Sequence, residues 1–252
     1  MGNGAASVER IVVLANGDSP FWHAFRRGLE DAERELRFED AGLRAEIVVN
    51  DGTAEDQLAK LQEFNREDDI AGVAVVPLTS EKGTVAEEMR KLQASGVKVI
   101  TINSDVDRET SRDARYAFIG TDNHQGGVAL GRCAQAVHPE GGGYVAFVGL
   151  TDAVNAVARI EGFQEGAGAA LYHLGSMGDD YDRLRARENV HSALEKYGDE
   201  LTTLVGIWAY NASAIADVVK ETGRRDKLTV VAFDAEAAAI ERVAQRASLV
   251  PA

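Results

Sequence analysis

The sequence contains very little cysteine, and this excludes several kinds of structure. Cys133 is the only cysteine among the 252 residues, so the chain can form neither an internal disulfide nor a cysteine-based metal site. It lies in a helical pattern between Leu130 and Val137. That setting predicts a small buried side chain rather than a reactive thiol.

Positive charge and long apolar runs are also scarce. The chain has 27 Lys and Arg residues against 41 Asp and Glu residues, a net charge of -14. This balance argues against nucleic acid as a partner, because phosphates require a basic surface, and it favours a neutral or cationic ligand. No apolar run approaches the roughly 18 to 20 residues that span a bilayer, so no direct membrane insertion is expected. The N-terminal MGNGAASVER lacks the pattern of a signal peptide.

Sequence motifs of catalysis and of phosphate binding are missing as well. The chain contains no G-x-x-x-x-G-K-[ST], H-E-x-x-H or G-x-S-x-G motif, and its five histidines are scattered. We therefore expect no catalytic residues, no metal and no cofactor. The glycines of HQGGVALG, residues 124–131, fall at the start of a helical pattern, which favours close helix packing.

What the sequence does contain is a regular alternation of strand and helix patterns. Short apolar runs predict strands at Ile11–Ala15, Ile47–Val49, Val73–Val76, Val97–Ile102, Ala117–Ile119, Tyr144–Val148, Leu204–Trp208 and Thr229–Phe233. The runs are continuous rather than alternating, which is typical of parallel strands covered by helices on both faces. A polar stretch, Asn103 to Arg115, interrupts the rhythm once. We therefore predict two α/β lobes, residues 8–104 and 105–250.

In open parallel sheets, ligands bind beyond the carboxyl ends of the strands. The first such end is followed by NGDSPFWHAF, residues 16–25, in which Ser19 suits a helix N-cap and Pro20 a first helical residue. Phe21 and Trp22 come next. From the pattern alone, packing in the core and stacking on a ligand are equally good interpretations of these two rings.

Polar residues follow several of the later strands. They include Asn103, Arg159, Asn211 and Asp234, while Asp122 or Asn123 is placed to cap a helix. Each Asn or Asp could simply be a helix cap, and Arg159 could be a surface residue. If they converge with several aromatic rings, the set predicts a site for a polyhydroxylated ligand.

Taken in order, the motifs SPFW, GVKVITINSDV, YAFIGTDNHQGG, ARIEGF, IWAYNASAI and VVAFDAE resemble a known family. The chain is similar, over roughly residues 9–245, to the periplasmic sugar-binding proteins of ABC transporters, ribose-binding type. These are type I periplasmic binding proteins, related to the ligand cores of LacI-type repressors. The resemblance implies two Rossmann-like lobes joined by three crossing segments, which close on a sugar about a hinge.

The resemblance also implies a set of ligand-binding residues. Phe21 or Trp22 and Tyr181 or Phe233 would sandwich the sugar, and we expect Phe21 to face it while Trp22 supports it from the core. Arg159 would make forked hydrogen bonds, for which Lys is a poor substitute. The full set is Ser19, Phe21, Trp22, Asn103, Thr121, Arg159, Tyr181, Asn211, Phe233 and Asp234.

Three departures from the family pattern qualify the ligand and the chain's extent. Val76 stands where ribose binders have a polar residue, and Asn103 stands where an Asp is usual, so ribose itself is disfavoured. The sequence stops at RASLVPA, where the family continues with the third crossing, a final helix and a final strand. Either the fold is truncated at its C-terminus, which we expect, or this end of the chain is built differently.

The leading expectation is a monomeric, periplasmic solute-binding protein that captures a small sugar or polyol in the interlobe cleft for an ABC-transporter permease. One alternative is the effector-binding core of a LacI-type regulator. That protein would carry a helix-turn-helix of about 50 to 60 residues before the first strand, where this chain has about ten. The other alternative is an enzyme on a doubly wound scaffold.

Overall fold

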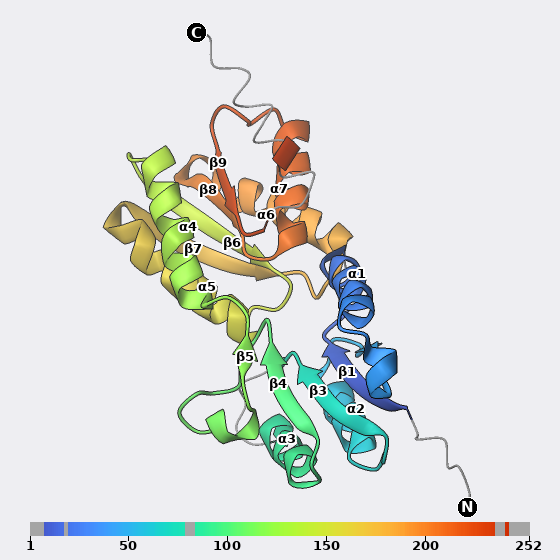
Figure 1. The fold of residues 1–252 in the computed structure, drawn as a ribbon. Coiled ribbons are helices and arrows are strands. Elements are labelled where there is room, and N and C mark those ends of the chain that lie inside the picture. The colour runs from blue at the N-terminus through green and yellow to red at the C-terminus, as the bar shows by residue number, and fades with distance from the viewer. Residues whose placement is uncertain (1–7, 18–19, 79–83, 235–239, 242–252) are drawn as a thin grey trace, which may run out of the picture. The chain divides into compact units, whose positions relative to one another are not determined.

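The computed structural model describes residues 8–17, 20–78, 84–234 and 240–241. The chain divides into two compact units, Met1–Thr121 and Asp122–Ala252. Each unit is a parallel β-sheet flanked by helices (Figure 1). None of the described helices is both long and apolar enough to cross a membrane. The predicted fold class, two α/β lobes with buried parallel strands, is confirmed.

The first unit contains a five-stranded sheet of order β2-β1-β3-β4-β5. Helix α1 covers one face, and α2 and α3 cover the other. The strands are β1 (Glu9–Ala15), β2 (Leu43–Val49), β3 (Ile70–Val75), β4 (Lys98–Ile102) and β5 (Phe118–Ile119). The helices are α1 (Pro20–Glu35), α2 (Ala54–Phe64), α3 (Thr84–Ala94) and the short 3-10 turns η1 (Phe38–Ala41) and η2 (Arg112–Ala114).

The second unit contains a four-stranded sheet of order β7-β6-β8-β9. Helices α4 and α5 cover one face, while α6 and α7 cover the other. The strands are β6 (Gly142–Val148), β7 (Leu171–Gly178), β8 (Leu201–Gly206) and β9 (Thr229–Ala232). The helices are α4 (Asn123–Val137), α5 (Val154–Ala167), α6 (Arg183–Tyr197), α7 (Ala209–Glu221) and the 3-10 turns η3 (Gly168–Ala170) and η4 (Gly198–Glu200).

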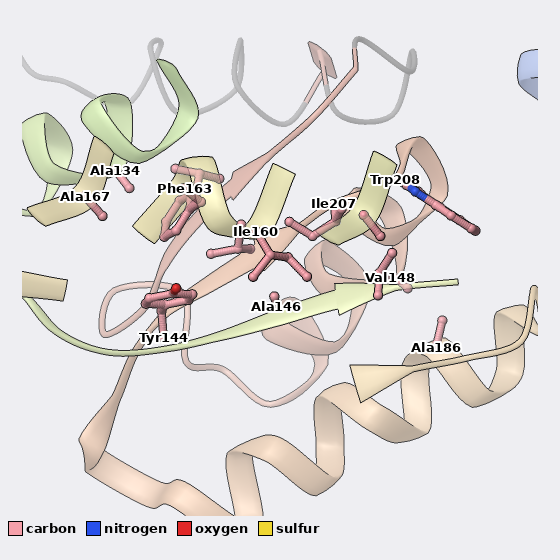
Figure 2. Close-up of a cluster of buried hydrophobic side chains, with 14 of the residues drawn as sticks. Ala134, Tyr144, Ala146, Val148, Ile160, Phe163, Ala167, Ala186, Ile207 and Trp208 are labelled. Atoms are coloured by element: carbon pink, nitrogen blue, oxygen red, sulfur yellow. The ribbon is translucent and has the colours of Figure 1, made fainter. Parts of the chain in front are cut away.

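Both faces of the central strands are buried, as the continuous apolar runs predicted. Val12 packs into the cluster beneath α2 and α3, and Val13 packs into the cluster beneath α1. In the second unit, Tyr144 and Val148 of β6 lie beneath α4 and α5, with Trp208 near the carboxyl end of the strand (Figure 2). Burial of such a side chain stabilises the fold by about 1.5–3 kcal/mol.

The eight predicted strands all overlap observed ones, but β7 was not predicted. It is an edge strand in which only Leu171 is buried, and its LYHLGSMG sequence contains two glycines and no apolar run. The predicted strand Leu204–Trp208 ends earlier, at Gly206, which places Trp208 beyond the sheet. Pro20 is the first residue of α1, and the Asp122 carboxylate caps α4 by accepting a hydrogen bond from the Gln125 amide, as predicted.

The first unit continues past Ser104, where the sequence pattern placed the boundary between lobes. The residues that follow stay with this unit because β5 pairs with β4, Phe118 opposite Thr101 and Ile119 opposite Ile102. The unit therefore ends at Thr121.

The α4–α5 contact shows why two glycines of HQGGVALG, Gly127 and Gly131, are needed. A Cβ at Gly127 would overlap the carbonyl oxygen of Arg159, and one at Gly131 would overlap that of Phe163. The predicted close helix packing is confirmed. Cys133, in contrast, is exposed, so the prediction that it is buried was wrong. The buried face of α4 carries Gly127, Val128, Gly131 and Ala134, and Cys133 projects from a different face.

Candidate functional site

Polar and aromatic groups gather at the carboxyl edge of the second sheet. After β6 the chain connects to β7 on one side, and the next strand, β8, lies on the other side of β6. Ligands of doubly wound sheets bind at such a reversal of strand order, beyond the strand ends. Gly149 follows β6, Asp179 follows β7, Trp208 follows β8, and Phe233 with Asp234 follows β9.

Arg159, on α5, is held rigidly at this edge. Its Nε donates to Asn123 Oδ1 at 2.9 Å, and its Nη1 donates to the backbone oxygen of Ile207 at 2.8 Å. The guanidinium also lies over the Phe233 ring, 4.3 Å from its centroid. Within the described part of the chain no hydrogen bond is formed by Nη2. Arg159 therefore presents a fixed charged donor next to an aromatic face.

Burial lowers the pKa of Arg159, while the negative charge of Asp234 opposes this shift. An arginine remains charged at neutral pH even so, because the ordinary pKa of a guanidinium lies far above neutral pH. Asp234 itself is exposed and has a left-handed backbone, with a φ of 67°. The pair supplies one cationic donor and one anionic acceptor, a combination suited to a ligand with several hydroxyl groups.

Trp208, which is buried, and Tyr181, which is partly buried, form an aromatic pair at the same edge. Their ring centroids are 5.3 Å apart with a tilt of 35°. The indole crosses the end of β6 at Gly149, where a Cβ would overlap the ring. Burial raises the pKa of the Tyr181 hydroxyl, and the charges of Asp179 and Asp152 add to the shift. Among the described residues, neither the Tyr181 hydroxyl nor the Trp208 indole nitrogen has a hydrogen-bond partner.

Asn211 lies in the same region but its side chain is fully buried. Its Oδ1 accepts a hydrogen bond from the Trp208 amide at 3.1 Å, and its Nδ2 donates to Asp179 Oδ2 at 2.9 Å. Asn211 Oδ1 therefore acts at the N-terminus of α7, in agreement with the helix-cap interpretation. Both ends of the amide are used within the protein.

In the first unit, the SPFW segment divides its two rings between core and surface. Trp22 is 5% exposed and packs under α1, while Phe21 is 43% exposed. The two rings meet edge to face, with centroids 5.1 Å apart. Trp22 Nε1 donates to Asn16 Oδ1 at 3.1 Å, which ties the helix to the end of β1. Phe21 is therefore the ring that a ligand could reach.

The remaining predicted residues of the first unit lie at the ends of β4 and β5. Asn103 adopts a left-handed conformation with a φ of 61°, and its backbone N–H donates a hydrogen bond to the Ile119 carbonyl at 3.0 Å. Thr121 is exposed just after β5. Ser19 lies outside the described residues.

Asp105, two residues beyond Asn103, anchors the segment that follows β4. Its carboxylate accepts hydrogen bonds from Thr101 Oγ1 at 2.6 Å and from Arg115 Nε and Nη2, each at 2.5 Å. Burial opposes ionisation of Asp105, but the bonds from Arg115 and Thr101 outweigh it and hold its pKa below the ordinary value.

Several of the predicted residues are thus brought together within the second unit. Arg159 meets Phe233 directly and interacts with the charge of Asp234, and Tyr181 meets Trp208. Sequence reasoning missed Trp208, Asp179 and Tyr210 as contributors. Trp208 had been assigned to a strand, and Asp179 could be placed at a strand end only if β7 had been recognised.

A comparison with protein-family models decides the family. Residues 10–248 match the model described as the periplasmic binding protein domain. The chain belongs to the periplasmic binding protein family. This agrees with the resemblance seen in the motifs and favours a binding protein over a LacI-type regulator.

Individual relatives of this periplasmic binding protein are distant but extensive. The D-allose-binding periplasmic protein of Escherichia coli is 24% identical, over 91% of this chain and 73% of its own. An ABC transporter solute-binding protein from Burkholderia graminis in complex with D-arabinose has a TM-score of 0.82 and 23% identity, covering 95% of this chain and 81% of that one. GanP, a glucose-galactose binding protein from Geobacillus stearothermophilus, has a TM-score of 0.81 and 21% identity, with coverages of 95% and 82%.

Proposed function

We propose that this periplasmic binding protein captures a small sugar or polyol and delivers it to an ABC transporter. The observation that carries the proposal is Arg159. Its guanidinium is fixed by Asn123 and Ile207 and stacked on Phe233, and its Nη2 forms no hydrogen bond with the residues that the structure describes. A sugar needs both kinds of contact, since its hydroxyl groups require charged or polar partners and its C–H faces pack on aromatic rings.

The surrounding groups support this ligand class. Asp234 adds an acceptor, Trp208 and Tyr181 add aromatic area, and Phe21 offers an exposed ring at the carboxyl edge of the first sheet. The relatives named above are, by their descriptions, binders of D-allose, of D-arabinose and of glucose and galactose. The residues we propose for the ligand site are Ser19, Phe21, Trp22, Asn103, Thr121, Arg159, Tyr181, Asn211, Phe233 and Asp234; Trp22 and Asn211 act as supports and the others as contacts.

We further propose that the protein works outside the cytoplasm, as a monomer, with a membrane permease as its partner, and that it performs no chemistry on the ligand. The family and the transport proteins among its relatives support the location and the partner. A binding protein needs only differential affinity between its conformations, without a nucleophile or a general base.

Isothermal titration against a panel of sugars tests the proposal. The panel contains D-allose, D-arabinose, D-glucose, D-galactose and several polyols. We expect saturable binding of at least one member with one site per chain. Arg159→Ala should abolish the heat of binding, whereas Arg132→Ala, at an exposed position of α4, should preserve it. A flat response of the wild-type protein to every sugar and polyol would overturn the proposal.

A further inference from the structure

Asp179 is a buried carboxylate whose role is not explained by the ligand contacts proposed above. It follows β7 directly and is 1% exposed. Its carboxylate accepts hydrogen bonds from the Tyr210 hydroxyl, from Asn211 Nδ2 at 2.9 Å and from the Tyr181 amide at 3.0 Å. All three donors are neutral. Burying a charge with neutral partners alone is costly compared with burying an ion pair or an apolar group.

No ion pair relieves this charge among the residues that the structure describes. Asp180, next in the chain, pairs with Arg185. Arg183 lies over the Tyr210 ring, 5.9 Å from its centroid. Burial raises the pKa of Asp179, and its three hydrogen bonds oppose that shift. A carboxylate kept in this setting points to a positional role, because an apolar residue would serve packing better.

The three hydrogen bonds join the two segments that carry the Tyr181 and Trp208 rings. On one side, Asp180 and Tyr181 both have left-handed backbones, with φ values of 51° and 64°. Non-glycine residues adopt this conformation at an energetic cost, so the turn at Tyr181 requires a stabilising contact. The Asp179 side chain supplies it through the Tyr181 amide, and its carbonyl accepts from the Asp182 amide at 2.9 Å.

On the other side, Asp179 holds the beginning of α7. It binds Tyr210 and Asn211, and Asn211 Oδ1 in turn accepts the Trp208 amide. One carboxylate therefore connects the backbone that carries the Tyr181 ring to the backbone that carries the Trp208 ring. These rings meet at a centroid distance of 5.3 Å.

We propose that Asp179 is a positioning residue that fixes the Tyr181 and Trp208 rings in the orientation that receives the ligand. The statement about the ligand rests on the proposed function, whereas the statement about the two rings can be tested without any ligand. Removing one charged acceptor should release the Tyr181 turn from the start of α7 and let the rings move independently.

The two tryptophans of the chain provide a direct readout in the ligand-free protein. Two-dimensional 1H–15N spectra contain one indole resonance from Trp22 and one from Trp208. In Asp179→Asn we expect the Trp208 resonance to shift or broaden and the Trp22 resonance to stay in place. The matched control is Asp180→Asn, which removes the neighbouring exposed carboxylate and should change neither. An unchanged Trp208 resonance in a folded Asp179→Asn protein overturns the proposal.

A pH titration separates positioning from general stabilisation. The Trp208 resonance should shift with pH in the wild-type protein and in Asp180→Asn as the buried Asp179 carboxylate changes charge, and this part of the shift should be missing in Asp179→Asn. The carboxylates of Asp152, Asp180 and Asp234 also lie near this edge, and any effect of theirs on the resonance would remain in Asp179→Asn. A titration that persists unchanged in that variant overturns the proposal. If Asp179→Asn does not fold, Tyr210→Phe removes a single donor, and its Trp208 resonance must shift.

Sugar affinity tests whether the position of the two rings matters for ligand binding. For the panel sugar that the wild-type protein binds most tightly, we expect Asp179→Asn to weaken binding about tenfold or more and Asp180→Asn to leave it unchanged. Wild-type affinity in Asp179→Asn would overturn the positioning role. If no sugar binds the wild-type protein, the proposed function fails, while the indole resonances still decide the role of Asp179.

Discussion

The guanidinium of Arg159 lies 4.3 Å from the centre of the Phe233 ring, so a charge and an aromatic face meet at the carboxyl edge of the second sheet. Arg159 comes from α5 and Phe233 from the segment after β9, and the two positions are far apart in sequence. The Phe233 ring supports the plane of the guanidinium, and the edge of the guanidinium can still donate hydrogen bonds. This geometry uses the planar fork of an arginine, which a lysine lacks.

We expect Arg159→Lys to reduce sugar affinity about tenfold to a hundredfold. Lysine cannot donate to Asn123 Oδ1 and Ile207 O together while also presenting a planar fork, so charge is conserved but geometry is lost. Titration calorimetry measures the loss. Arg185→Lys, at an exposed ion pair with Asp180, is the control and should bind normally. Equal affinity of Arg159→Lys and wild type would show that only the charge matters.

Phe21 and Trp22 should respond to truncation in opposite ways. Phe21→Ala removes an exposed ring and is expected to weaken sugar binding much more than it lowers the melting temperature. Trp22→Ala empties a position in the core under α1, and should lower the free energy of unfolding by about 3–5 kcal/mol. Calorimetric titration and thermal unfolding of both variants provide the comparison. The reverse pattern would mean that both rings serve the core.

The fold could be predicted from the sequence wherever strands are buried on both faces. A continuous apolar run such as Val73–Val76 indicates such a strand, because helices cover both of its faces and polar side chains are excluded from both. β7 escaped prediction since an edge strand can carry Tyr172, His173 and glycines at little cost. Cys133 was wrongly predicted to be buried, because its helix consists largely of small residues and such a pattern does not indicate which face is buried.

The candidate site was predictable in its location but not in its internal contacts. The rule that ligands meet strand ends led to Arg159 and Asp234, and the resemblance added Tyr181 and Phe233. The sequence alone could not show that the Asn211 side chain donates a hydrogen bond to Asp179. That contact joins the turn after β7 to α7, 32 positions apart in sequence. Such long-range pairings depend on the assembled sheet rather than on local pattern.

Asp105 should make the first unit sensitive to acid. Its folded-state pKa lies below the ordinary value of about 3.9, so its carboxylate stabilises the fold above that pH. This contribution is lost as the pH falls through the lower, folded-state value. We expect Asp105→Asn to lower the free energy of unfolding by about 3 kcal/mol at neutral pH, because Arg115 is left buried without its partner. The difference from wild type should shrink in acid, as urea unfolding at several pH values would show.

Asp113→Asn is the matched control for this effect. Asp113 also accepts two hydrogen bonds from one arginine, Arg90, but its side chain is 68% exposed. Exposed pairs contribute little to stability, so we expect a change of less than about 1 kcal/mol. A loss as large as that of Asp105→Asn would contradict the importance assigned to burial.

Gly149 should be sensitive to the addition of a single methyl group. A Cβ at this position would overlap the Trp208 ring and lie 2.9 Å from the Tyr210 hydroxyl, so Gly149→Ala must displace the indole. We expect altered Trp208 fluorescence, weaker sugar binding and destabilisation of about 1–3 kcal/mol. Gly28→Ala, in α1, has open space around its Cβ and should instead stabilise the protein by up to about 1 kcal/mol. If Gly149→Ala bound sugar normally with unchanged fluorescence, the position of Trp208 would not depend on the close approach of the β6 backbone.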